Sequence, residues 1–214
     1  MAPILEVRDL SHIYSVGTPF QRTAIEHVSF SVERGEFIGV IGHTGSGKST
    51  LIQHLNGLLK PTSGQILFDG RDIWSDKAFT RSIRFQVGLV FQYPEYQLFE
   101  ETVYKDIAFG PKNMGLPPEE IRRRVLEAAA FVGVPEEHLD KSPFDLSGGQ
   151  KRRLALMLIL LDEPTSNLDS LNEGIILKSL KESAEEKTIV LVSHRVSTMN
   201  VANVVYKMEN GRIS

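Results

Sequence analysis

The segment at residues 42–49, Gly-His-Thr-Gly-Ser-Gly-Lys-Ser, places the strongest constraint on the fold of this chain. It has the pattern of a phosphate loop: Gly, four residues, Gly-Lys and then Ser or Thr. Glycines tolerate positive φ angles, so successive backbone N–H groups can point toward a triphosphate. Residues 36–41 before the loop form an apolar run typical of a buried strand. Residues 50–55 after it begin a helix, whose N-terminus favours an anion. This context predicts that the chain binds a nucleoside triphosphate.

Each part of the phosphate loop has an expected role. Lys48 should reach the β- and γ-phosphates, and the hydroxyl of Ser49 should hold Mg²⁺. The backbone N–H groups should surround the phosphates. The nucleotide-binding positions predicted in this way are Gly42, His43, Thr44, Gly45, Ser46, Gly47, Lys48, Ser49 and Thr50.

Composition narrows the classes of protein. The 214 residues are enough for one domain with a lobe, and 41% of them are hydrophobic, as in ordinary globular proteins. A net charge of −3 argues against a general nucleic-acid surface, so we expect no nucleic acid partner. The absence of cysteine excludes disulfides and thiolate metal sites. We find neither a secretory signal nor the roughly 18 consecutive apolar residues of a membrane span.

The order of β and helical patterns predicts an α/β fold with two additions. The predicted strands are residues 4–14, 24–32, 36–41, 65–68, 87–91, 157–161 and 188–192, and the predicted helices are residues 50–55, 102–109, 118–131 and 171–185. A hairpin turn is expected at Asp69-Gly70. We interpret residues 1–214 as a single domain, with an α/β core, an antiparallel β lobe and a helical subdomain at about residues 95–155.

Two further segments carry candidate chemistry. The apolar run 157–161 delivers Asp162 and Glu163 to the end of a strand, where open α/β sheets bind their ligands. Asp162 would hold Mg²⁺ and Glu163 would polarise the attacking water, although such a pair can also be a solvated strand end. The turn Ser147, Gly148, Gly149 and Gln150 opens a helix and is either a second anion site or a simple helix cap.

Together these segments resemble the ATP-binding cassette (ABC) ATPases over essentially the whole chain. The resemblance implies a P-loop NTPase core and assigns roles by position. Gln92 matches the glutamine that senses Mg²⁺ and the attacking water. His194 matches the histidine that contacts the γ-phosphate, its alternative being a cap on a strand. Tyr14 matches the aromatic residue that stacks on adenine, its alternative being packing in the core.

The resemblance also implies partners. In this family two cassettes meet head to tail, so residues 147–150 would bind the nucleotide of a second, identical or different, ABC chain. Residues 166–169 match the segment that communicates across that dimer. Hydrolysis would be supported by Lys48, Gln92, Glu163 and His194. The chain would work on an integral membrane transporter subunit, from the cytoplasmic face of the membrane.

A finer comparison divides the chain. Residues 1–153 look like energy-coupling-factor importer ATPases, which serve uptake of vitamins or of cobalt and nickel ions, whereas residues 158–214 look like an exporter-type ABC domain, as in a hybrid. Only residues 151–161 separate Gln150 from Asp162, too few for the strand and for a helix of about 11 residues. Either the residues are missing from the sequence as given, or the protein lacks them. The alternative function is therefore a nucleotide-binding module with little or no turnover.

Overall fold

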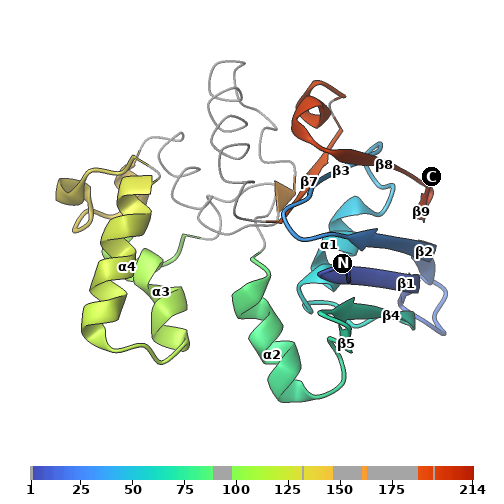
Figure 1. The fold of residues 1–214 in the computed structure, drawn as a ribbon, viewed down its shortest axis with the longest axis horizontal. Helices are drawn as coiled ribbons and strands as arrows, with labels where there is room; N and C mark the ends of the chain where they lie inside the picture. The colour runs from blue at the N-terminus through green and yellow to red at the C-terminus, as the bar shows by residue number, and fades with distance from the viewer. Residues whose placement is uncertain (1, 89–97, 132, 147–160, 163–187, 195) are drawn as a thin grey trace. The chain divides into compact units, whose positions relative to one another are not determined.

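The computed structural model describes residues 2–88, 98–131, 133–146, 161–162, 188–194 and 196–214 (Figure 1). The chain forms two compact units. The first unit comprises Met1–Leu89 and Leu160–Ser214, and the second comprises Val90–Ile159.

The first unit contains an antiparallel sheet at its N-terminal end. Its strands are β1 (Leu5–Tyr14), β2 (Arg22–Val32), β4 (Ser63–Phe68) and β5 (Arg71–Asp72), in the order β2-β1-β4-β5 (Figure 1). Asp69 and Gly70 turn the chain between β4 and β5 with φ angles of 49° and 76°. Positive φ at both positions suits a tight hairpin turn. The predicted strands and hairpin of the β lobe are confirmed.

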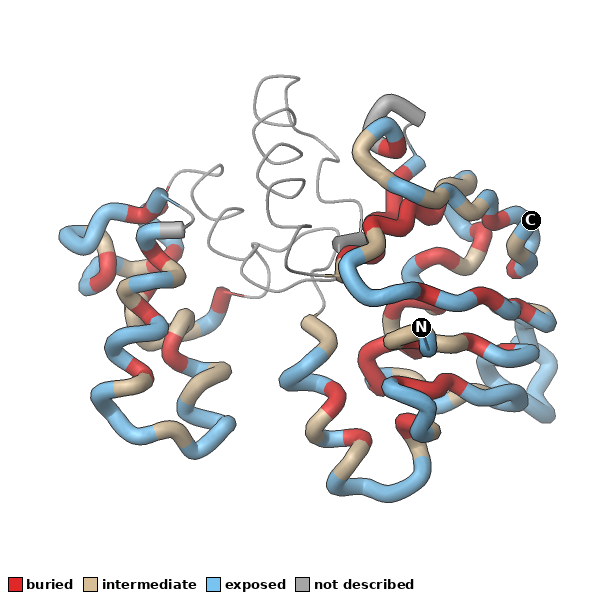
Figure 2. The backbone as a smooth tube through the Cα atoms, in the orientation of Figure 1, coloured by how far each residue is buried: buried red, intermediate tan, exposed pale blue. Residues whose placement is uncertain are grey.

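The second sheet of this unit is largely parallel. Its strands are β3 (Phe37–Ile41), β6 (Leu161–Asp162), β7 (Ile189–Ser193), β8 (Val204–Glu209) and β9 (Arg212–Ile213), in the order β6-β7-β3-β8-β9. All five residues of β7 are buried, as Figure 2 shows, and continuous burial is expected for central parallel strands. Helix α1 (Lys48–Leu55) follows β3, and a 3₁₀ helix (Val196–Val201) precedes β8.

Some predicted elements of this unit are changed or not described. Helix α2 (Lys77–Gln86) was not expected; it begins at Asp76, whose side chain accepts a hydrogen bond of 2.9 Å from the N–H of Phe79. Residues 87–88 of the expected strand 87–91 are not in a strand. The remainder of that strand, like the expected helix at residues 171–185, lies outside the described residues.

The second unit is helical where it is described. Helix α3 (Val103–Asn113) begins at Thr102, whose hydroxyl accepts from the N–H of Lys105 at 3.2 Å, and α4 spans Pro118–Phe131. Two 3₁₀ helices follow, at Glu136–His138 and Pro143–Asp145. The predicted helices at 102–109 and 118–131 are confirmed. The core of this unit consists of Leu98, Val103, Ala108, Ile121, Val125, Ala129, Val134, Leu139 and Leu146.

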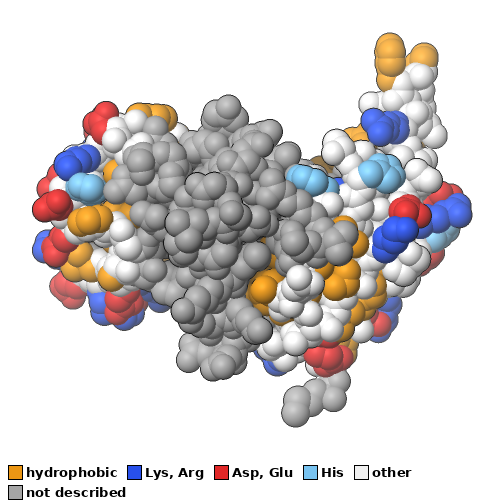
Figure 3. Space-filling model, turned by 90° about the horizontal axis from the view of Figure 1, so that it is seen from above, with side chains coloured by type: hydrophobic (Ala, Val, Ile, Leu, Met, Phe, Trp, Pro, Cys, Tyr) orange, Lys and Arg blue, Asp and Glu red, His pale blue; other side chains and the backbone are white. Residues whose placement is uncertain are grey.

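The described surface carries charges of both signs. On the face shown in Figure 3, acidic and basic side chains are interspersed. On α4, Arg123 pairs with Glu120 and Glu127 at 2.7 and 2.6 Å. Among the residues that the structure describes, no helix is long and apolar enough to cross a membrane.

Candidate functional site

Strand register brings three of the predicted site segments to one edge of the parallel sheet. Asp162 at the end of β6 is paired with Val192 of β7, and Ile41 at the end of β3 is paired with Ser193. The carboxyl ends of parallel strands share one edge, which is where such sheets bind ligands. Three neighbouring strands therefore end side by side. The phosphate loop follows β3, Asp162 is the last residue of β6, and His194 is exposed directly after β7.

The backbone of the phosphate loop requires glycine at specific positions. Gly45 and Gly47 have φ angles of 83° and 105°, which side chains of L-residues rarely adopt. A Cβ on Gly47 would lie 2.4 Å from the carbonyl oxygen of Ala24, and a Cβ on Gly42 would lie 2.2 Å from that of Met208. The loop thus packs directly against the backbones of β2 and β8. At these two positions only glycine, which has no Cβ, fits the space.

Lys48 lies along the phosphate loop at the start of α1. Its ammonium donates hydrogen bonds of 2.9 Å to the carbonyl of Gly42 and 3.0 Å to that of His43. The residue is only 5% exposed. A cation held at the backbone of a glycine loop is the arrangement that receives the phosphates of a nucleotide.

Two serine hydroxyls in or next to the phosphate loop are available to a nucleotide and a divalent cation. Ser49 is exposed at the first turn of α1. The hydroxyl of Ser46 is buried and lacks a hydrogen-bond partner among the described residues. Mg²⁺ takes oxygen ligands from one or two side chains together with substrate phosphates. The exposed hydroxyl of Ser49 suits that donor set, and Asp162 lies at the end of β6, where its carboxylate is the expected second donor.

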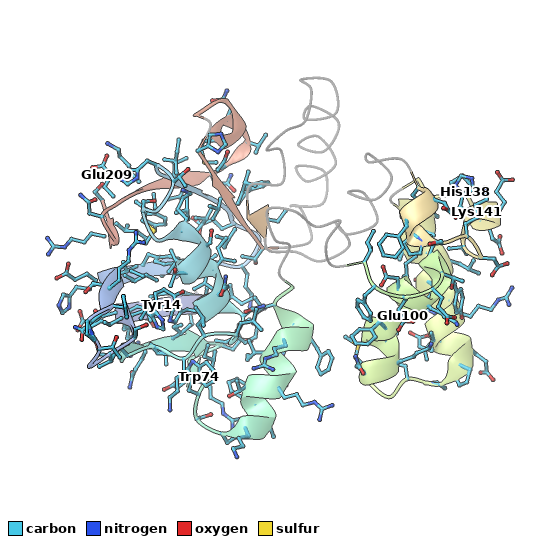
Figure 4. The ribbon with its side chains drawn as sticks, turned by 180° about the vertical axis from the view of Figure 1, so that it is seen from behind. Tyr14, Trp74, Glu100, His138, Lys141 and Glu209 are labelled. Carbon is cyan, nitrogen blue, oxygen red and sulfur yellow. The ribbon has the colours of Figure 1, made fainter. Side chains whose placement is uncertain are left out.

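Tyr14 is positioned beside the phosphate loop helix by the hairpin of β1 and β2 (Figure 4). Its hydroxyl lies 3.2 Å from the hydroxyl of Thr50, and the residue is 39% exposed. This exposure argues against the alternative that Tyr14 only packs in the core. Part of its ring is available to stack on a base.

Arg22 is a candidate that the sequence did not single out. It is paired with Tyr14 across the two strands. One guanidinium nitrogen lies 3.8 Å from the position that a Cβ on Gly45 would occupy. An arginine next to the glycine loop can contribute charge to a polyphosphate. The only signal in the sequence is a basic residue at the predicted entry to β2, which is too common to interpret alone.

Several predicted site residues are not placed by the structure. Gln92, Ser147, Gly148, Gly149, Gln150 and Glu163 lie outside the described residues, as do residues 166–169. Only the backbone of Asp162 is described. The roles of all these residues stay predictions.

Comparison with known families identifies the class of protein. The profile of the family described as "ABC transporter" matches residues 25–168. The match covers more than half of the chain and includes the phosphate loop, Asp162 and Glu163. This chain belongs to the ABC transporter family and is an ATP-binding ATPase subunit of that family.

The names of similar proteins define a narrower class of transporter ATPase. The energy-coupling factor transporter ATP-binding protein EcfA2 of Caldanaerobacter subterraneus subsp. tengcongensis is 50% identical over 220 residues, covering 98% of this chain and 77% of the relative. EcfA2 of Clostridium tetani is also 50% identical over 220 residues, covering 97% of this chain and 76% of the relative. These matches also span most of residues 158–214, for which an exporter-type resemblance was expected.

Solved structures agree with this class. The structure of cbiO1 from Clostridium perfringens, part of the ABC transporter complex cbiONQ, has a TM-score of 0.86 and 38% identity, covering 100% of this chain and 88% of that one. A dimeric bacterial ABC transporter cassette has a TM-score of 0.86 and 26% identity, covering 98% and 96% of the two chains. The predicted fold class and the predicted family are confirmed.

Proposed function

We propose that this chain is the ATP-hydrolysing subunit of an importer of the energy-coupling-factor type. The observation that carries the proposal is the register of β6, β7 and β3, which aligns Asp162, His194 and the phosphate loop at one sheet edge. Relatives named EcfA2 at 50% identity support the importer type.

The residues of the chain divide the work of phosphoryl transfer by position and charge. Lys48 and the loop N–H groups would bind the phosphates, and Ser49, Asp162 and Gln92 would hold Mg²⁺. When bound, Mg²⁺ neutralises charge that develops on the phosphate oxygens. Glu163 would polarise the attacking water and His194 would contact the γ-phosphate, so that orientation supplies most of the rate enhancement.

Two kinds of partner complete this function. A second ABC chain would place its phosphate loop against Ser147, Gly148, Gly149 and Gln150, so each ATP would lie between two chains. A dimeric cassette among the similar structures supports this arrangement. Closure of that dimer with ATP and its opening after hydrolysis would move an integral membrane subunit, with this chain bound peripherally at the cytoplasmic face.

The substitution Glu163→Gln tests the proposal. It should reduce phosphate release from ATP by at least about 100-fold, since a group that orients the attacking water acts in the transition state. ATP affinity should be retained, as measured by isothermal titration calorimetry. Glu119→Gln on the exposed side of α4 is the matched control and should leave phosphate release unchanged. Equal phosphate release by the two variants would show that Glu163 is not the catalytic carboxylate.

A second candidate function is nucleotide binding with little turnover. The match to the Caldanaerobacter relative extends over 220 aligned positions, although only 98% of this 214-residue chain takes part. The alignment therefore includes positions without a counterpart in this chain, and we propose that they fall in the short segment 151–161. Calorimetric binding of ATP without any phosphate release by the unmodified chain would favour this candidate.

A further inference from the structure

Four residues of the first unit, Tyr14 among them, form a closed set of contacts through side chains and one backbone carbonyl. The Tyr14 hydroxyl lies 3.2 Å from the Thr50 hydroxyl. The carbonyl of Thr50 lies 2.7 Å from Nδ1 of His54, and Nε2 of His54 lies 3.1 Å from Nδ1 of His12. The ring of His12 then meets the ring of Tyr14 edge to face, with 4.5 Å between centroids. The contacts thus return to the residue from which they started.

The proton position on His54 follows from chemistry. A carbonyl oxygen only accepts, so Nδ1 of His54 carries a proton and donates to the backbone carbonyl of Thr50. Nε2 of the neutral His54 ring is then an acceptor, within hydrogen-bond distance of Nδ1 of His12. Burial is the main cause that lowers the pKa of His54 to about 4. Burial also lowers the pKa of His12, and a hydrogen bond with the backbone of Lys60 opposes part of this effect. His54 is 0% exposed, so its ring is held neutral and in one orientation.

This arrangement fixes Tyr14 at two points. Its hydroxyl is engaged with Thr50 in the first turn of α1, and its ring rests against the buried ring of His12 on β1. Edge-to-face ring contacts favour a particular mutual orientation. The accessible part of the Tyr14 ring therefore has a defined orientation. The Tyr14 hydroxyl is hydrogen-bonded to Thr50, in the same helical turn as Lys48 and Ser49.

We propose that His12 and His54 are positioning residues that hold the Tyr14 ring in the orientation that receives the adenine base. The inference rests on the proposed function, in which Tyr14 stacks on adenine. His12 contacts the Tyr14 ring directly, so its loss should affect binding of the base and not of the phosphates. His54 acts on Tyr14 through His12 and through the Thr50 turn.

A comparison of two ligands tests this inference. Binding of ATP and of inorganic tripolyphosphate, which has no base, is measured by calorimetry for the complete chain. His12→Leu should weaken ATP binding roughly threefold to tenfold, the worth of one aromatic contact, and leave tripolyphosphate binding unchanged. His12→Gln keeps a donor for His54, which protects folding, and should show the same selective loss. His12→Phe keeps a ring against Tyr14 and should bind ATP more tightly than His12→Leu.

A double-mutant cycle with Tyr14→Ala separates this inference from the proposed function. Once Tyr14 is absent, His12→Leu should cause no further loss of ATP affinity, because coupled residues are not additive. His138→Leu in the second unit is the control and should change neither affinity.

Three results would overturn parts of the account. Equal losses for ATP and tripolyphosphate would mean that the histidines act on the phosphate loop, contrary to the inference. A loss with Tyr14→Ala but none with His12→Leu or His12→Gln would refute the inference alone. No loss with Tyr14→Ala would refute the proposed adenine contact itself.

Discussion

At the scale of single residues, the phosphate loop owes its shape to close contacts of backbone with backbone. Gly47 is next to the carbonyl of Ala24 and Gly42 is next to that of Met208, on strands that are distant in sequence. The pattern of the loop predicts where glycine is needed. It does not predict which strands press against each glycine, because those contacts depend on the packing of the two sheets.

Replacing Gly47 by alanine should therefore damage both stability and binding. The added Cβ meets the carbonyl of Ala24 at 2.4 Å and the φ angle is 105°, so we expect a loss of about 1–3 kcal/mol in the free energy of unfolding and a strong loss of ATP affinity. Urea denaturation and calorimetry measure the two effects.

The control for this change is Gly110→Ala within α3, where a Cβ meets no atom within 4 Å. It should be neutral or stabilising by about 0.5–1 kcal/mol, because alanine favours a helix. A Gly47→Ala variant as stable as its parent would contradict the contact seen at Ala24.

Arg22 should contribute to phosphate binding from the edge of β2. Arg22→Gln removes a charge near Gly45, so affinities for ATP and for tripolyphosphate should both fall, by roughly twofold to fivefold as for an exposed charge pair. The loss should diminish at high salt. Arg81→Gln, at an exposed position of α2, is the control. A loss for ATP alone would place Arg22 at the base instead of the phosphates.

At the scale of elements, the helices and strands differ in how well the sequence predicts them. Helix α4 has the predicted bounds because Pro118 begins it and its apolar residues recur at helical spacing. Helix α2 was missed although the sequence holds two signals for it: Phe79 and Ile83 lie four residues apart, at helical spacing, and Asp76 is a suitable N-cap. Strand β8 was missed although Tyr206, Lys207, Met208 and Glu209 alternate between apolar and polar side chains, as in a half-buried strand.

The candidate site follows the same division. The phosphate loop and the strand-end position of Asp162 could be predicted from local motifs, whereas Tyr14 and His194 were proposed only through the resemblance to the ABC ATPases. Arg22, His12 and His54 were not, because their positions depend on the pairing of β1 with β2 and on the packing of α1 against that sheet. Single basic and imidazole side chains carry no spacing that reveals such contacts.

The buried His54 on α1 should make stability depend on pH. Its pKa falls from 6.5 to about 4 in the folded protein, so the unfolded chain binds more protons between these values. Stability should therefore decrease as pH falls from about 6.5 to 4, by on the order of 1 to 3 kcal/mol from this residue. Urea denaturation as a function of pH measures the slope. His54→Leu should flatten it, and an unchanged slope would exclude His54 as its cause.

At the scale of the whole molecule, two units carry different parts of the proposed function. The first unit holds the phosphate loop, Asp162 and His194, while Ser147, Gly148, Gly149 and Gln150 belong to the second unit. In a head-to-tail dimer, the second unit of one chain would serve the nucleotide on the first unit of its partner. Hydrolysis should then require two chains, unlike ATP binding.

The rate of phosphate release from ATP and Mg²⁺, measured over a range of protein concentrations, tests the central claim most directly. We expect release whose rate per chain rises with protein concentration, as a dimer forms, and which Glu163→Gln abolishes. ATP binding by a dimer of this chain with no phosphate release would contradict the claim that this chain is a hydrolysing transport subunit.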